Sequence, residues 1–539
     1  MKHLNLIGTS LAVMLLALSC SSDDTTNNGV PNPEGGAGGA AGHTAGSGGK
    51  PASNAGSAGK SGSPAASGGS DSAGAGDLDS AGAAGEAGAA GAPNGEITPF
   101  DGSCATLPGK VVYIESGDTQ ENLLKYLGRH LRDTSNINIA FNLTGSCTLT
   151  NDIYTNAKVV PNGTLKYIPS TAEAPDWTVA QAEPTCTTGP EGVPVDLAIS
   201  ALFVESCGLG GPPSGSNLDL IQGPIQAYAF VVPNASSQTA IGSDEAYYTF
   251  GFGDENPLSP TYDPWNNHNF MFIRPTTKST LVAIAKNIGV PPAKWKGIAE
   301  NASSDVVSAV AGSSSPEATI GILGTEVYDA KRTSAGIKTL AFQAVGQQGA
   351  FFPDSNSAAF DKQNLRDGHY TLWSSTVYIT PVTAAHVPAN PAVKYIEDLV
   401  LGNPVSAPPS GGTVFEALAD VIQVGLIPEC AMKVTRAADG GELSVYTPEA
   451  PCTCFYLSKI PGASGTPAGC TACTSSASCA GGDCIHGFCE PDAVSTTGST
   501  VPGCVSTASA SYSDIINQCT NAQAIQKSVV LPNPKVALP

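Results

Sequence analysis

Short apolar runs alternate with helical repeats of apolar residues between positions 111 and 424. The run Val111–Ile114 predicts a buried strand, and the leucines between positions 123 and 131 mark one face of a helix, with Asp118 or Thr119 as its cap. Further strands are expected at 137–141, 195–200, 226–232, 319–323, 339–343 and 370–379, and further helices at 304–311, 326–331, 393–401 and 414–424. Such alternation predicts α/β domains with mainly parallel sheets, in which ligands collect beyond the carboxyl ends of strands.

The stretch Asn269–Lys286 combines a strand, a turn and a helix start. An apolar strand at Phe270–Ile273 is followed at once by Arg274, and a helical repeat begins after a hydroxyl-rich turn. The first turn of a helix offers unpaired N–H groups and the positive end of the dipole, and an arginine adds a bidentate grip, so an anion site is predicted. The alternative is a surface helix capped by Thr280 or Thr277, with Arg274 in a salt bridge.

The N-terminus predicts export. Residues 1–19 contain Lys2 and the apolar run Leu11–Leu18, which is too short to span a bilayer and is typical of a signal peptide. Leu16–Cys20 resembles the lipobox of bacterial lipoproteins, which implies that Cys20 is acylated and anchors the chain in the cell envelope, facing the periplasm or the cell surface. The alternative is an ordinary secretory signal with a spare cysteine.

The segment 20–99 is dominated by Gly, Ala and Ser, with almost no large apolar side chain. Such a composition cannot bury a core, so this segment is predicted to be a disordered tether. The formal charge of the whole chain is −21, which argues against nucleic acid as a partner. An acidic chain can still bind an anion in a local pocket.

The chain has 15 cysteines, and 14 remain if Cys20 is acylated. An even number in an oxidising compartment predicts disulfides. The candidates are Cys104, Cys147, Cys186, Cys207, Cys430, Cys452, Cys454, Cys470, Cys473, Cys479, Cys484, Cys489, Cys504 and Cys519. The first five precede the Cys-rich tail, and five is an odd number, so at least one bridge must join the body to the tail if all are paired. Zinc at the Cys-x2-Cys pair is the alternative.

Several segments in order resemble the type II periplasmic substrate-binding proteins, and most of all their phosphate-binding branch. Tyr113–Thr119 is similar to the first ligand loop of that family, Thr144–Cys147 to its second Gly-Ser loop, and Val195–Ser200 to the strand before its third loop. Arg274–Thr280 is similar to the Arg and Ser-Gly-Thr element of the opposite domain, and Asp367–Leu372 to the strand that crosses back. The resemblance covers about residues 104–430.

The resemblance implies two lobes joined by two crossover segments, with a ligand closed between them. Lobe I would comprise residues 100–232 and 374–430, lobe II residues 233–373, and the Cys-rich C-terminal segment residues 431–539. The implied ligand is a small, phosphate-like oxyanion, and the implied partner is the permease of an ABC transporter.

Carried over residue by residue, the implied ligand contacts are Thr119, Ser146, Arg274 and Thr280, with Ser279 nearby. Two positions depart from the pattern of the family. Ala201 stands where the third loop normally supplies an aspartate, and Lys278-Ser279-Thr280 lacks the glycine that permits close backbone approach.

These departures leave an alternative function open, that of a surface interaction or structural lipoprotein on a degenerate scaffold without a small ligand. A secreted hydrolase is a third class, but no nucleophile–base pair is visible and the seven histidines show no metal-ligand or triad spacing. No catalytic residue, metal or cofactor is therefore predicted.

Overall fold

The computed structural model describes residues 100–258, 264–491, 511–527 and 535–539. The predicted signal peptide, Cys20, the tether and Cys504 lie outside these residues. Within the described part of the chain, no helix is long and apolar enough to cross a membrane.

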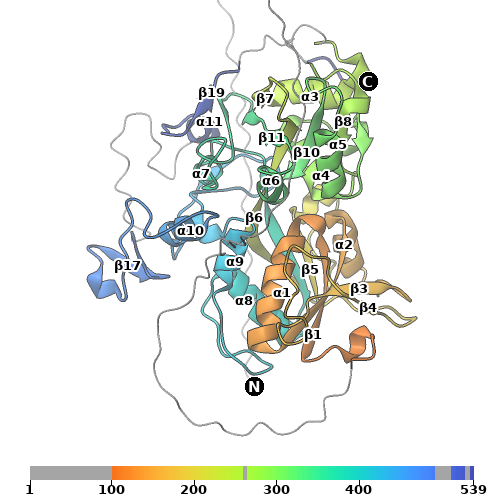
Figure 1. The fold of residues 1–539 in the computed structure, drawn as a ribbon, viewed down its shortest axis with the longest axis vertical. Helices are drawn as coiled ribbons and strands as arrows, with labels where there is room; N and C mark the ends of the chain where they lie inside the picture. Colours follow the sequence, from red (N-terminus) through yellow and green to blue (C-terminus); the bar gives the residue numbers. More distant parts are fainter. Residues whose placement is uncertain (1–99, 259–263, 492–510, 528–534) are drawn as a thin grey trace, which may run out of the picture. The chain divides into compact units, whose positions relative to one another are not determined.

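The first half of the fold is built on a sheet with the strand order β2-β1-β5-β14-β6 (Figure 1). The two pairings β1–β2 and β1–β5 are parallel, whereas β14 runs antiparallel to both β5 and β6. The two short strands β3 and β4 extend the sheet beyond β2. The strands are β1 Lys110–Gly117, β2 Ile137–Thr144, β3 Thr164–Tyr167, β4 Thr185–Thr187, β5 Leu197–Ser200, β6 Leu218–Pro233 and β14 Trp373–Pro381.

Helices cover both faces of this sheet. The apolar side chains of α1, α8 and α9 pack on one face, and those of α2 pack on the other. These helices are α1 Glu121–Ser135, α2 Ser146–Tyr154, α8 Pro391–Leu401 and α9 Ala417–Gln423. The leucines predicted to face the core from α1 are all buried, which agrees with their helical spacing.

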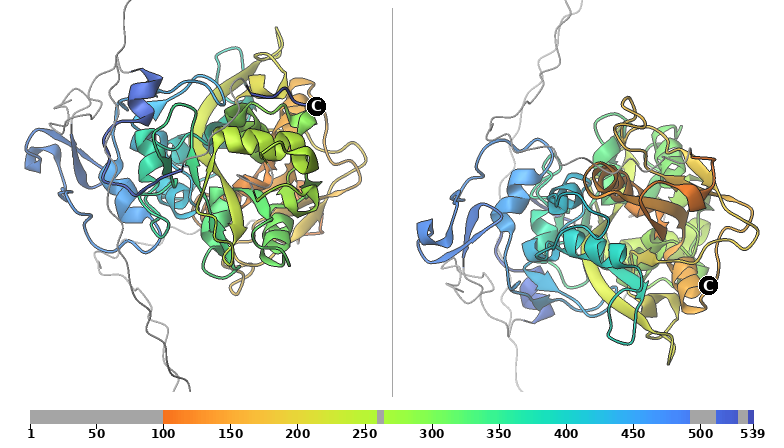
Figure 2. Two further views of the ribbon diagram at one scale, coloured as in Figure 1. Left: turned by 90° about the horizontal axis from the view of Figure 1, so that it is seen from above. Right: turned by 90° about the horizontal axis from the view of Figure 1, so that it is seen from below.

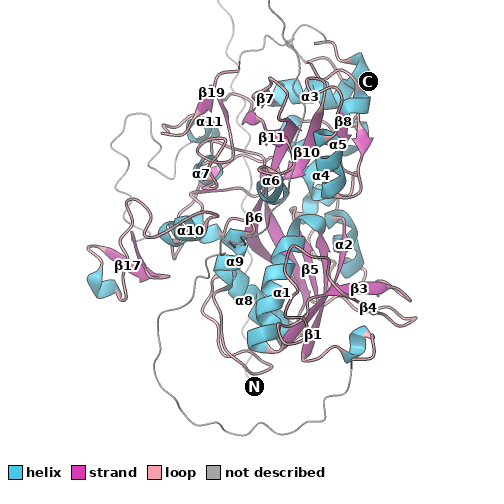
Figure 3. Cartoon of the chain, in the orientation of Figure 1, coloured by secondary structure: helices cyan, strands magenta, loops and turns pink. Residues whose placement is uncertain are grey.

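The second half repeats this order as β9-β8-β10-β6-β11. The strand β6 belongs to both halves, because Leu218–Ala227 pairs with β14 and Tyr228–Pro233 pairs with β10 and β11. The strands are β8 Met271–Ile273, β9 Ile298–Ala299, β10 Ile320–Gly324 and β11 Ile337–Thr339, and the helices are α3 Ser243–Phe252, α4 Ser279–Ile288, α5 Ser303–Ala311, α6 Thr325–Lys331 and α7 Gln363–Asp367. Figure 3 separates the helices from the strands by colour.

Two halves with one strand order, joined by long crossing strands, confirm the predicted fold class, the two-lobed type II binding-protein fold. The parallel pairs of the large sheet are β1–β2 and β1–β5 in the first half and β8–β9 and β8–β10 in the second, whereas β14 and β6 run against their neighbours. The lobe boundaries at residues 232 and 373 stay predictions.

A second, smaller sheet has the order β19-β13-β12-β7, so a strand from near the C-terminus completes it. Figure 2 shows the C-terminal segment, coloured blue, from two further sides. Its strands are β7 Ala240–Gly242, β12 Ala341–Gln343, β13 Ala350–Phe351 and β19 Ala524–Ile525. The rest of the C-terminal segment contains β15 Val434–Thr435, β16 Ser444–Val445, α10 Thr453–Lys459, β17 Gly482–Ile485, β18 Phe488–Pro491 and α11 Tyr512–Ile516. Apolar side chains of α10 and α11 are buried in the largest hydrophobic cluster, so this segment packs on the body as well as being cross-linked.

Six disulfides pair twelve of the candidate cysteines: Cys104–Cys186, Cys147–Cys207, Cys430–Cys452, Cys454–Cys470, Cys473–Cys484 and Cys479–Cys489. Cys519 is also disulfide-bonded. The predicted bridge between body and tail is Cys430–Cys452. The sulfur atoms of Cys473, Cys479 and Cys489 lie within 4.8 Å of one another, but oxidised sulfur is not the thiolate that zinc requires.

Candidate functional site

The five predicted ligand residues all lie just after central strands of the two sheets. Thr119 follows β1 in the 3-10 turn Asp118–Gln120, and Ser146 is the first residue of α2, directly after β2. Arg274 follows β8, and Ser279 and Thr280 open α4. All five are buried, with relative exposures between 1% and 4%. The groups thus come from strand ends and helix starts, which are positions where anions can bind, and their role as ligand contacts stays a prediction.

The loops before α2 and α4 touch, and this contact joins the two halves. The N–H of Cys147 donates to the Thr277 carbonyl over 3.4 Å, and Lys278 Nζ donates to the Thr144 carbonyl over 3.0 Å. A Cβ atom at Gly145 would lie 2.6 Å from the Thr277 carbonyl oxygen, so only glycine permits this approach.

Arg274 is held by three groups, and one of them is a carboxylate. Its guanidinium lies 2.7 Å from Asp118 Oδ2 and donates to Ser303 Oγ at 2.7 Å and to the Asn301 carbonyl at 2.9 Å. Lys278 Nζ lies 3.6 Å from Asp118 Oδ1. Burial opposes the ionisation of Asp118, but Arg274 and Lys278 outweigh it and hold the pKa of that carboxyl below its usual value. The site thus contains two cations and one internal anion.

The predicted helix caps were wrong. The N-cap residue of α1 is Gln120, without a side-chain bond, because the 3-10 turn separates Asp118 from the helix and turns its carboxylate towards Arg274. The N-cap residue of α4 is Lys278, again without a side-chain bond. The salt bridge of Arg274 in the alternative interpretation is present, but α4 is a buried helix and not a surface one.

Ser146 and the third loop are connected through Ala201. The Ala201 N–H donates to Ser146 Oγ over 3.0 Å, and the phenol of Tyr228 donates to the Ala201 carbonyl over 2.5 Å. Burial raises the pKa of Tyr228 well above its usual value, so this phenol stays protonated. A carboxylate from the C-terminal segment reaches the third loop, since Asp439 Oδ2 accepts from the Phe203 N–H over 3.1 Å.

Thr119 offers a hydroxyl that no described group satisfies. Its Oγ1 atom is buried and has no hydrogen-bond partner within the described part of the protein. A Cβ at Gly117 would lie 3.5 Å from this oxygen and 4.0 Å from Ser146 Oγ, so the two hydroxyls flank the same glycine. Since buried polar groups are normally paired, the Thr119 hydroxyl is available to a ligand.

Sequence reasoning missed a buried polar chain that reaches both halves. Gln120 Nε2 donates to Gln226 Oε1 over 2.9 Å, and Gln226 Nε2 donates to Glu326 Oε2. Burial raises the pKa of Glu326 to about 8, and the negative charge of Asp118 adds to the shift. Gln120 is adjacent to the predicted Thr119, but nothing in the local sequence connects it with Gln226 or Glu326.

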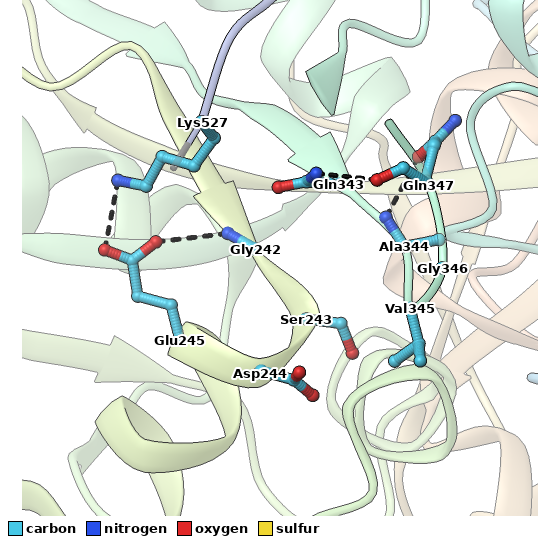
Figure 4. A pocket seen from close by; sticks show the side chains of 10 residues that line it. All are labelled: Gly242, Ser243, Asp244, Glu245, Gln343, Ala344, Val345, Gly346, Gln347 and Lys527. Atoms are coloured by element: carbon cyan, nitrogen blue, oxygen red, sulfur yellow. Dashed lines mark hydrogen bonds and ion pairs between the residues drawn. The ribbon is translucent and has the colours of Figure 1, made fainter. Parts of the chain in front are cut away.

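A separate pocket of about 320 Å³ lies at the start of α3 (Figure 4). Its walls include Gly242, Glu245, Gln343 and Gln347. Glu245 is paired with Lys527 at 3.0 Å and accepts from the Gly242 N–H at 3.1 Å, so its carboxylate is already satisfied. The five predicted ligand residues are not among the residues that line this pocket.

Comparison with known proteins gives structural likeness only. No family model matches the sequence, and no curated protein matches it. A Clostridium perfringens protein described as a phosphate ABC transporter substrate-binding protein, solved with bound phosphate, is 9% identical with a TM-score of 0.37, over 59% of this chain and 99% of its own. An ABC-type phosphate transport receptor from Vibrio cholerae is 12% identical with a TM-score of 0.35, over 59% of this chain and 99% of its own.

A regulatory domain, the reduced form of that of OxyR from Pseudomonas aeruginosa, is also similar. It is 7% identical with a TM-score of 0.28, over 51% of this chain and 90% of its own. Transport receptors and a regulatory domain are thus similar to this chain to about the same degree, so the similarity assigns neither a ligand nor a partner.

Proposed function

We propose that this protein is an extracytoplasmic solute-binding protein, anchored by lipid on Cys20, that captures a small oxyanion between its two halves. The protein binds this oxyanion without a catalytic step and delivers it to the permease of an ABC transporter. The observation that carries the proposal is a pair of cations, Arg274 after β8 and Lys278 at the start of α4, together with a hydroxyl of Thr119 that has no partner among the described residues. Hydroxyls and helix N-termini suit an anion that stays ionised.

Titration calorimetry on the full-length protein, unfolded and refolded to remove carried ligand, tests the proposal with phosphate, sulfate, molybdate and small carboxylates. One of these anions should bind, and Arg274→Ala should weaken its affinity at least about tenfold, about 1.4 kcal/mol, because a charge-assisted contact is lost. Arg274→Lys serves as the control that keeps the charge. Unchanged affinity in Arg274→Ala would refute the site.

A second candidate function rests on Asp118. This carboxylate is already paired with Arg274, and it also accepts hydrogen bonds from the N–H and the hydroxyl of Ser303, at 3.2 and 2.9 Å. An internal anion in this position favours a surface interaction or structural lipoprotein that has replaced its ligand with its own side chain.

Asp118→Asn separates the two functions. If the wild-type protein is a receptor, the variant should bind the same anion several-fold more tightly, because a competing negative charge is gone. If Asp118 has replaced the ligand, the wild-type protein should bind no anion and only the variant should show heat of binding. Weaker binding in the variant would contradict the assignment of Asp118 as a competitor.

A further inference from the structure

The chain Gln120–Gln226–Glu326 connects the two halves through the strand that they share. Gln120 ends the turn after β1, Gln226 lies on β6, and Glu326 is in the first turn of α6. The relative exposures of the three residues are 0%, 0% and 2%. Buried polar chains of this kind are stable when every member is satisfied.

This chain is not satisfied at either end. Gln120 Oε1 and Glu326 Oε1 are buried without a hydrogen-bond partner among the described residues. The hydroxyl oxygens of the neighbouring residues Thr119 and Thr325 are also buried without a hydrogen-bond partner among the described residues. Unpaired buried groups cost free energy, so four of them on the two segments that Gln226 links indicate a polar group that belongs there.

The two ends differ in their chemistry. Gln120 Oε1 is an amide oxygen and only accepts. Glu326 Oε2 accepts from Gln226, and at neutral pH the carboxyl, whose pKa burial raises to about 8, keeps its proton, which leaves Oε1 to donate. A hydroxyl group is uncharged and can both accept from Glu326 and donate to Gln120. An ammonium cannot accept, and a carboxylate cannot donate.

The chain and the cations belong to one cluster. Asp118 is bonded to Arg274 and lies two residues before Gln120, and its charge acts on Glu326. A ligand whose anionic group meets Arg274 and Lys278 therefore has a polar, uncharged surface beside it.

We propose that the oxyanion carries a hydroxyl group of its own, held between the amide oxygen of Gln120 and the carboxyl of Glu326. The ligand class is a small hydroxylated organic anion, whether a hydroxycarboxylate or a hydroxyalkyl phosphate. This inference rests on the proposed function and narrows it, because it names a carbon-bound hydroxyl group, which neither inorganic phosphate, whose hydroxyl is on phosphorus, nor sulfate carries.

Calorimetry on the full-length protein with matched ligands tests the inference. The pairs are lactate against propionate and 2-hydroxyethyl phosphate against ethyl phosphate, which differ by one hydroxyl group. In at least one pair the hydroxylated member should bind at least about tenfold more tightly. A ligand without the hydroxyl leaves both Gln120 Oε1 and the carboxyl of Glu326 unpaired. The pair that binds identifies the anionic group.

Three variants connect the preference with the chain, and a fourth is the control. Gln120→Leu and Glu326→Leu should each reduce the preference to less than about threefold, whereas Glu326→Gln should keep it, since an amide also offers a donor beside an acceptor. Gln348→Leu, at an exposed glutamine, is the matched control. The wild-type comparison needs no variant, so a leucine variant that fails to fold does not prevent the test.

Two results overturn the inference and are distinguishable. Inorganic phosphate or sulfate that binds as tightly as the hydroxylated ligands, with loss in Arg274→Ala, would leave the proposed function standing and refute the hydroxyl. No heat with any anion from a folded sample would refute both.

Discussion

At the scale of single residues, the burial of Glu326 has a consequence for stability that can be measured. Its pKa is raised from 4.5 to about 8, chiefly by burial. Between these values the folded protein keeps a proton that the unfolded chain has lost, so the free energy of unfolding falls as pH rises. The loss from this one group is up to about 1.4 kcal/mol for each pH unit.

Glu326→Gln should remove this dependence, because an amide does not ionise and can keep the bond with Gln226. We expect the variant to be more stable than the wild type at pH 8, and the difference to shrink towards pH 5. Chemical denaturation at pH 5, 6.5 and 8 measures it. A stability difference that is the same at all three pH values would show that Glu326 titrates normally in the folded protein.

At the scale of helices and strands, the spacing of apolar residues along the sequence predicted those elements that form because one face is buried. The spacing of leucines in α1 and the apolar run of β8 follow from which face is buried, so the elements and their alternation were predictable. The helix start after β8, which carries Ser279, was predictable for the same reason, whereas α2, which begins at Ser146, was not among the predicted helices.

Contacts between distant segments were not predictable in this way. Asp118 pairs with Arg274 across 156 positions of the sequence, and Gln226 bonds with Glu326 across 100. A carboxylate before a helix, such as that of Asp118, can be a helix cap or a member of an ion pair. Only the contact between the two halves of the folded protein shows which of the two it is. The disulfide pairing had to be open for the same reason, since spacing alone allows many connectivities.

At the scale of the whole described body, the C-terminal segment connects the two halves. Asp439 accepts from the Phe203 N–H of the first half. The Arg436 guanidinium lies 4.0 Å from the centre of the Trp373 ring, at the start of the crossing strand β14, and donates to the Trp373 carbonyl over 3.1 Å. A Cβ at Gly440 would lie 2.8 Å from the Lys286 carbonyl carbon, so this part of the segment also touches α4 of the second half. The segment is therefore placed to resist separation of the halves.

Asp439→Ala should release this contact. The Phe203 N–H would be left without its acceptor and the buried Arg436 without its nearby carboxylate, so we expect a loss of about 1–3 kcal/mol in the free energy of unfolding. Hydrogen exchange in the peptide around Phe203 should become faster, because the third loop loses its tie to the tail. Asp439→Asn, which keeps an acceptor, should lose less, and Asp483→Ala, at an exposed position of the tail, should change neither quantity. Unaltered exchange around Phe203 in Asp439→Ala would mean that the other contacts of the segment hold the halves together without this carboxylate.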